Sequence, residues 1–122
     1  MVNSIERIVG VFPPAQQPQI IMQLANTLQG IIVQQLLPTV GNRGMVLAYE
    51  LLMVESPERS IIRDNAAHKL YTQLETGTKR GMSTMDASLS NLYERGIITY
   101  DSMLSNSTFP DLIRKRYNRT GV

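Results

Sequence analysis

The spacing of hydrophobic residues predicts helices at both ends of this chain and strands between them. Residues 3–11 and 15–29 carry apolar positions three and four residues apart. In the second segment these are Ile20, Ile21, Leu24, Ala25 and Leu28. Pro13 separates the two helices because a proline disfavours the α conformation of the residue before it. Pro18 is tolerated in the first turn of the second helix, and Gly30 is expected to end that helix.

The middle of the chain predicts a β-hairpin. Residues 31–37 are apolar and β-branched, residues 39–44 are typical of a turn, and residues 45–54 are nearly all apolar except Glu50. The second strand therefore resembles one that is covered on both faces. Because two strands alone are marginally stable in water, we expect the other strands of the sheet to lie outside this sequence.

The segment from Gly77 to Gly96 carries the clearest helix signals. Ser83 or Thr84 can cap the first turn, and Asp86 places a negative charge near the positive end of the helix dipole. Gly96 suits the left-handed position that ends a helix. The apolar positions expected on one face are Met82, Met85, Leu89, Leu92 and Tyr93. This pattern predicts a packing helix without a reactive side chain on its apolar face.

Four more short helices are expected after residue 54. Ser56 is predicted to cap the first, which runs to Asp64, and the second covers residues 66–76. Thr99 and Thr108 are predicted to cap the last two. The residues expected to face inward from the final helix are Phe109, Leu112 and Ile113. The predicted fold class is thus α+β and mostly α, with a hairpin followed by a small helical bundle.

The composition is that of a globular domain with little net charge. Of 122 residues, 43% are hydrophobic, the formal net charge is +2, and there is no cysteine, so disulfides and cysteine-ligated zinc are excluded. The sequence lacks an apolar run of about 18 residues and a signal-peptide pattern, so a cytoplasmic location is expected. The basic residues near the end, Arg114, Lys115, Arg116 and Arg119, are typical of a solvated helix end, and no nucleic acid is expected as a partner.

The sequence offers no catalytic, cofactor-binding or metal site. Gly77-Thr78-Lys79 is the nearest approach to a phosphate-binding loop, but it lies between two helices with no strand before it. His68 is the only histidine, which is too few ligands for a structural zinc.

Arg59 and Arg63 form the most informative polar pair. They lie four residues apart and therefore share a helix face, while Ile61 and Ile62 are expected on the buried side. Guanidinium groups can bind carboxylates or phosphates bidentately. The alternative is an exposed basic stripe that pairs with Glu55 or Asp64.

The order of these signals resembles the PilT-type ATPases, the hexameric motors of the type IV pilus and relatives of the type II secretion ATPases. The resemblance runs through Ile5-Glu6-Arg7-Ile8-Val9-Gly10-Val11-Phe12-Pro13-Pro14 and through Ile31-Ile32-Val33-Gln34-Gln35-Leu36-Leu37-Pro38. It continues in Gly81-Met82, Thr84-Met85-Asp86, Leu92-Tyr93 and Arg95-Gly96. The resemblance implies that residues 1–54 are the end of a RecA-like ATPase core and that residues 55–122 are its C-terminal helical domain.

It also implies a motor for pilus retraction in twitching motility. The family uses ATP and Mg²⁺, assembles from neighbouring subunits into a homohexamer, and acts at the cytoplasmic face of the inner membrane with a pilus platform protein. Because the family's nucleotide-binding loop would precede residue 1, the chain alone is expected to be inactive as an ATPase.

One family element can be carried over. PilT proteins have a short helix, usually Ala-Ile-Arg-Asn-Leu-Ile-Arg, that is implicated in retraction. Residues 57–63 match it at Arg59, Ile61, Ile62 and Arg63 and depart from it at Pro57, Glu58 and Ser60. The resemblance thus implies a coupling role for this helix. The alternative function is a free-standing helical module that binds an acidic protein or nucleic acid through its basic tail.

Overall fold

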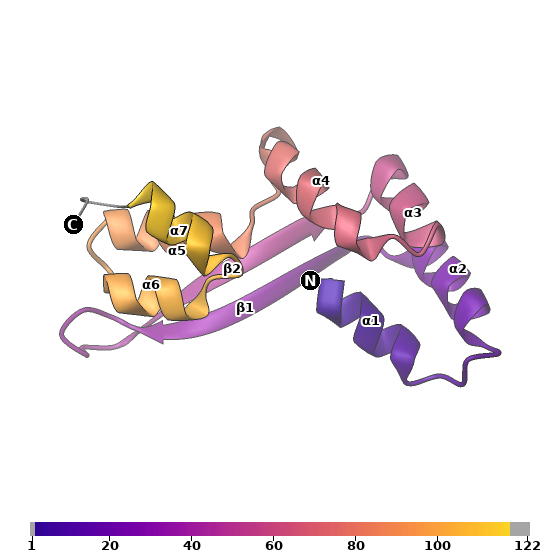
Figure 1. The fold of residues 1–122 in the computed structure, drawn as a ribbon, viewed down its shortest axis with the longest axis horizontal. Coiled ribbons are helices and arrows are strands. Elements are labelled where there is room, and N and C mark those ends of the chain that lie inside the picture. The colour runs from indigo at the N-terminus through magenta and orange to yellow at the C-terminus, as the bar shows by residue number, and fades with distance from the viewer. Residues whose placement is uncertain (1, 118–122) are drawn as a thin grey trace. The chain divides into compact units, whose positions relative to one another are not determined.

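The computed structural model describes residues 2–117, which form one β-hairpin and a series of short helices (Figure 1). The α-helices are α1 (Val2–Gly10), α2 (Gln17–Thr27), α3 (Ser56–Arg63), α4 (Leu70–Thr76), α5 (Met85–Glu94), α6 (Tyr100–Asn106) and α7 (Pro110–Arg116). The antiparallel strands are β1 (Gly30–Pro38) and β2 (Met45–Met53), and two 3₁₀ turns are η1 (Ala67–Lys69) and η2 (Thr78–Arg80). The predicted α+β, mostly helical class is confirmed.

The chain forms two compact units. One unit holds the chain up to Val33 together with Glu50–Ser83, and the other holds Gln34–Tyr49 together with the chain from Thr84 onward. The division expected near residue 54, between an ATPase core and a helical domain, concerns a longer protein and stays a prediction.

The first unit packs α1 to α4 around one apolar core. The core residues are Ile5, Ala25, Leu52, Val54, Ile62, Ala67, Leu70, Leu74 and Met82. Leu51 and Ser83 exchange backbone hydrogen bonds of 2.9 and 3.1 Å, so the chain that follows η2 is tied to β2. This pairing places Met82 in the first core.

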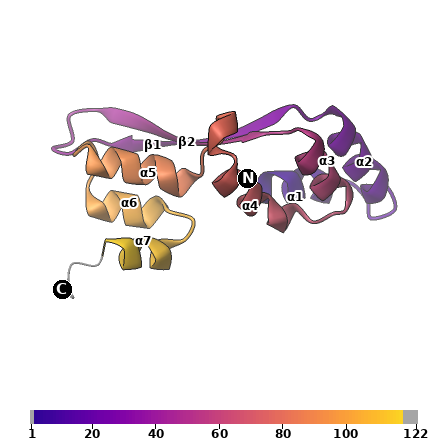
Figure 2. The ribbon, with the colours of Figure 1, turned by 90° about the horizontal axis from the view of Figure 1, so that it is seen from above.

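The second unit layers α5, α6 and α7 against the tip of the hairpin (Figure 2). The backbone N–H of Tyr49 donates to Ser88 Oγ at 3.1 Å, and that of Val40 donates to the Ile97 carbonyl at 2.8 Å. The buried side chains of this unit are Leu37, Ala48, Met85, Leu89, Leu92, Ile98, Met103 and Ile113, with the polar Ser90.

Several predicted helix signals are confirmed. Thr84 is the N-cap of α5 and accepts from the Ala87 N–H at 3.0 Å, and Thr99 caps α6 in the same way. Gly96 has φ +75°, the left-handed conformation expected after α5. Two boundaries were wrong: α2 ends at Thr27 because Leu28 is already extended, and α3 is capped by Glu55 in place of Ser56.

The predicted apolar faces need three corrections. Met82 precedes α5 and packs in the first core, so it does not share a face with Met85. On α7 only Ile113 is buried, whereas Phe109 and Leu112 are 43% and 63% exposed. Thr108 is not the cap, because the N-cap is Phe109, and Asp86 accepts from the backbone N–H groups of Thr108 and Phe109 just before α7.

The hairpin also differs from the expectation that β2 is covered on both faces. Exposure alternates along β2, and its exposed hydrophobic residues are Met45, Leu47, Tyr49 and Met53. Glu50, the polar exception in the strand, points to the buried side and is 3% exposed.

Candidate functional site

Helix α3 carries the predicted site residues, and its first turn is built around a buried carboxylate. The Glu58 side chain is fully buried, and its Oε1 accepts a hydrogen bond of 2.9 Å from the backbone N–H of the N-cap residue Glu55. Ile62 lies four residues later on the same side and is 2% exposed, while Ile61 is half-buried against the core. The buried side of α3 thus agrees with the predicted positions of Ile61 and Ile62.

The two arginines of α3 have different surroundings. Arg59 is half-buried, and its guanidinium donates to the backbone carbonyls of Ala25 at 2.9 Å and Val54 at 3.2 Å. Arg63, one turn later, is exposed, and within residues 2–117 no side chain pairs with it. In this described part of the chain neither arginine bonds to Glu55 or Asp64, the partners considered from the sequence.

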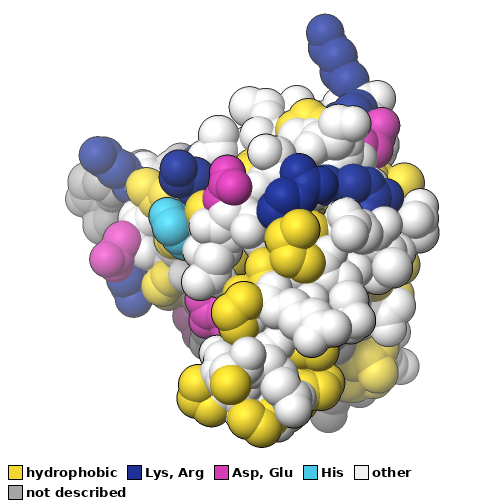
Figure 3. Space-filling view, turned by 90° about the vertical axis from the view of Figure 1, so that its right-hand side faces the viewer, with side chains coloured by type: hydrophobic (Ala, Val, Ile, Leu, Met, Phe, Trp, Pro, Cys, Tyr) yellow, Lys and Arg dark blue, Asp and Glu magenta, His cyan; other side chains and the backbone are white. Residues whose placement is uncertain are grey.

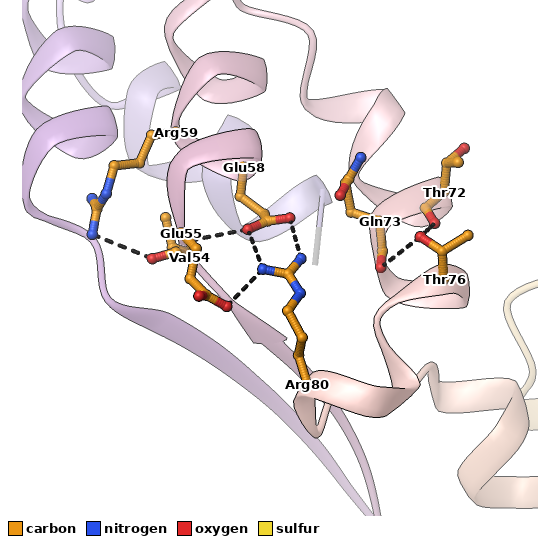
Figure 4. Close-up of polar contacts among 8 residues, drawn as sticks. All are labelled: Val54, Glu55, Glu58, Arg59, Thr72, Gln73, Thr76 and Arg80. Atoms are coloured by element: carbon orange, nitrogen blue, oxygen red, sulfur yellow. Dashed lines mark hydrogen bonds and ion pairs between the residues drawn. The ribbon is translucent and has the colours of Figure 1, made fainter.

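Arg80 is the residue that the sequence reasoning missed (Figure 4). It leaves η2 and points at the first turn of α3, where its guanidinium bonds Glu58 Oε2 at 2.7 Å, Glu58 Oε1 at 3.3 Å and Glu55 Oε1 at 2.6 Å. The available signal was that Glu58 precedes Ile62 by four residues and so faces the core. A carboxylate buried there requires a cation.

The ion pair fixes the charge state of both partners. Burial would raise the pKa of the Glu58 carboxyl, but the hydrogen bonds from Arg80 and Glu55 and the positive charge of Arg80 hold that pKa below its ordinary value. The hydrogen bond to Glu58 in turn raises the pKa of Arg80. Both side chains are therefore charged at neutral pH, and the departure at Glu58 from the family pattern is neutralised within the chain.

The described residues contain no group of three or more His, Asp or Glu side chains that could hold a metal ion. His68 lies exposed in η1, and Lys79 lies in η2 between two helices. Within residues 2–117 no helix combines the length and the apolar character needed to cross a membrane. Among the described residues, α3 presents the charged side chain of Arg63 at the surface.

The basic residues at the C-terminal end are partly neutralised. Arg114 pairs with Asp111 at 2.6 Å, and Arg116 lies 4.0 Å from Glu94. Burial, and then a hydrogen bond to Glu94, raise the pKa of Tyr117. Arg119 lies outside the described residues. Figure 3 draws a different face, the right-hand side of Figure 1, on which Lys and Arg side chains lie among hydrophobic and uncharged ones.

Comparison with known proteins places this arrangement in context. No family model matches the chain. A twitching motility protein of Neisseria gonorrhoeae is 36% identical over 96 residues, which are 79% of this chain and 26% of that protein. The type IV pilus ATPase PilU of Pseudomonas aeruginosa is 34% identical over 105 residues, which are 86% of this chain and 28% of that protein. The chain thus spans less than a third of the length of these relatives.

Solved structures also match the fold of this chain. The crystal structure of the pilus retraction motor PilT with bound ADP matches 94% of this chain and 32% of its own, with 37% identity and a TM-score of 0.81. The ATPase DotB of Legionella pneumophila matches 95% of this chain at 20% identity and a TM-score of 0.67, which supports the shared fold alone. By sequence and by fold, this chain belongs to the PilT-type family of type IV pilus ATPases and corresponds to their C-terminal part.

Proposed function

We propose that this chain is the C-terminal portion of a hexameric ATPase motor that drives type IV pilus retraction, and that it transmits nucleotide-driven motion. The observation that carries the proposal is the match of 79% to 94% of the chain to proteins named for twitching motility and pilus retraction. The contacts of α3 support a transmitting role, because Arg59 and Glu58 tie this helix to the end of α2 and to η2.

In this proposal the longer protein binds ATP and Mg²⁺ through residues that precede this chain. Residues 1–54 form the end of its RecA-like core, and residues 55–122 form its helical domain. The exposed apolar side chains on the hairpin, among them Leu36, Met45 and Leu47, support a core that continues over this face. The partners are neighbouring subunits and the inner-membrane platform protein of the pilus, and the location is cytoplasmic, at the membrane surface.

A chimera tests the proposal. The matching C-terminal part of the N. gonorrhoeae twitching motility protein is replaced by residues 1–122, and the chimera is expressed in a strain that lacks its own protein. We expect the purified chimera to hydrolyse ATP and the strain to regain twitching. A chimera that assembles and hydrolyses ATP but leaves the strain immotile would overturn the proposal.

A smaller graft covers the case in which the chimera does not fold. Residues 55–64 replace only the corresponding helix of the same host protein, and twitching is again expected. If this graft also hydrolyses ATP without twitching, α3 does not carry the function proposed for it. Binding of the 122-residue chain to duplex DNA that weakens steeply with added salt would favour the nucleic-acid module instead.

A further inference from the structure

The last helix, α7, leaves apolar side chains in water at its start. Figure 2 draws α7 as the helical layer farthest from the tip of the hairpin. Ile113 is the buried residue of α7, whereas Phe109 and Leu112 are 43% and 63% exposed. Single exposed apolar side chains are common, but these two lie three residues apart and are therefore neighbours on the helix. Together they form a small apolar surface.

Cations continue the same edge of the helix. Leu112 adjoins Lys115 and Arg116, because residues three and four positions apart are neighbours on a helix. Lys115 is exposed, and within residues 2–117 no side chain pairs with it. The Arg116 side chain is 61% exposed and lies 4.0 Å from Glu94, at the limit of an ion pair. Phe109, Leu112, Lys115 and Arg116 are called the α7 strip below.

The acidic residue of α7 does not oppose these cations. The Asp111 carboxylate pairs with the Arg114 guanidinium at 2.6 Å, so these two charges offset each other. The charges of Lys115 and Arg116 therefore remain available on the α7 strip. In the sequence Arg119 adds a further basic residue, outside the described part of the chain.

This combination distinguishes α7 from other exposed cations. Arg7, Arg63 and Arg95 each follow or precede a carboxylate directly in the sequence, and Arg43 stands alone in the hairpin turn. Three basic residues in succession occur in this sequence at residues 114–116 and nowhere else. Of these surfaces, α7 therefore has the charge that best suits an extended anionic surface.

We propose that the α7 strip binds the surface of an anionic phospholipid bilayer. In this arrangement Phe109 and Leu112 enter the boundary between headgroups and acyl chains, and Lys115 and Arg116 bind lipid phosphates. Basic helices with apolar residues on one side lie in membrane interfaces in this way, and the long stems of Lys and Arg reach from apolar surface to the headgroups. The inference goes beyond the proposed motor function and does not depend on it.

The small size of the strip favours lipid over a protein partner. A stable protein interface takes about 800 Å² from each side and roughly 20–30 residues. Four side chains of a helix of seven residues and its N-cap offer far less than this. A lipid surface requires no complementary shape, so a small strip of apolar and basic side chains suffices to bind it reversibly.

Sedimentation of the 122-residue chain with lipid vesicles tests the proposal. One set of vesicles is phosphatidylcholine alone, and in the other set half of the lipid is phosphatidylglycerol. We expect binding to the anionic vesicles that weakens as salt is added, and little binding to the neutral ones. Lys115→Glu should lower the affinity about 5- to 30-fold, because each basic residue near such a surface contributes about fivefold. Leu112→Ser should lower it about fivefold through lost apolar burial.

Two matched controls and one structural readout accompany these variants. Arg43→Glu reverses an exposed cation of the hairpin turn, and Val11→Ser replaces an apolar side chain that is 78% exposed. Both should bind within about twofold of the parent, since charges far from the membrane are screened. All four variants should unfold within about 3 °C of the parent, as surface substitutions do. Anionic vesicles should slow hydrogen exchange in α7 and leave α4 unchanged.

Three results would overturn the inference. The first is no sedimentation with anionic vesicles. The second is an equal loss of affinity in Lys115→Glu and Arg43→Glu, which would show that net charge acts and the strip does not. The third is duplex DNA that binds as tightly as the vesicles, with Leu112→Ser without effect on either, because cations alone would then explain the binding. The chimera tests the motor function separately.

Discussion

The buried carboxylate of Glu58 gives the sharpest prediction about stability. Replacing Glu58 with glutamine keeps the size and shape of the side chain, so it opens no cavity. It removes the negative charge that accepts hydrogen bonds from Arg80 at 2.7 and 3.3 Å and from the Glu55 N–H at 2.9 Å. A glutamine amide carries an NH₂ group in place of one carboxylate oxygen, so one of these donors would then face another donor.

The expected loss follows from the contacts. Hydrogen bonds to charged groups contribute about 1.5–3 kcal/mol each, against about 0.5–1.5 kcal/mol for neutral ones. Removing one partner of a fully buried ion pair costs about 3–5 kcal/mol, but the Arg80 side chain is 34% exposed, so water can solvate its charge after the substitution. We therefore expect Glu58→Gln to lower the free energy of unfolding by about 2 kcal/mol.

Urea unfolding at pH 7, followed by circular dichroism, measures this difference. The matched control is Asp111→Asn, which breaks the exposed pair with Arg114 and should cost less than about 0.5 kcal/mol, since the Asp111 side chain is 94% exposed. If Glu58→Gln and Asp111→Asn lose equally little stability, the reasoning about the buried clamp is refuted.

Three further predictions concern acid, a helix cap and a close contact. Because folding lowers the pKa of the Glu58 carboxyl, the charged carboxylate stabilises the folded chain above its ordinary pKa of 4.5, and this stabilisation is lost as the pH falls through the pKa of the folded state. The difference in unfolding free energy between the parent and Glu58→Gln should therefore close when urea titrations are repeated in acid. Asp86→Ala removes the acceptor of the Thr108 and Phe109 N–H groups just before α7 (2.6 and 3.0 Å) and should cost about 1–2 kcal/mol of unfolding free energy, with faster hydrogen exchange in α7. Gly77→Ala should lower the unfolding temperature, because the added Cβ would lie 2.5 Å from Met82 Sδ and 2.7 Å from a backbone carbonyl; an unchanged temperature would contradict the packing described here.

The sequence predicts those parts of the fold that depend on neighbouring residues. The caps at Thr84 and Thr99 and the left-handed Gly96 were predicted because each acts within one helical turn. The choice of Ser56 as a cap was wrong since Glu58 reaches back to the Glu55 N–H, which shifts the start of α3 by one residue.

Features that depend on distant residues could not be predicted. Asp86 accepts from the Thr108 N–H group, 22 residues away and just before α7, and Phe109 lies on the surface instead of in the core. The clamp between Glu58 and Arg80 spans the same separation and crosses from α3 to η2. The helical pattern identified the arginine-bearing helix, but only the structure distinguishes the bound Arg59 from the exposed Arg63.

In the proposed function these 122 residues transmit motion and perform no chemistry of their own. The most direct measurement is the rate of ATP hydrolysis by the purified chain alone with Mg²⁺, compared with a mock preparation from cells that lack it. The account predicts no hydrolysis above that of the mock preparation. Turnover on the order of 1 s⁻¹ or faster that follows the chain through every purification step would contradict it.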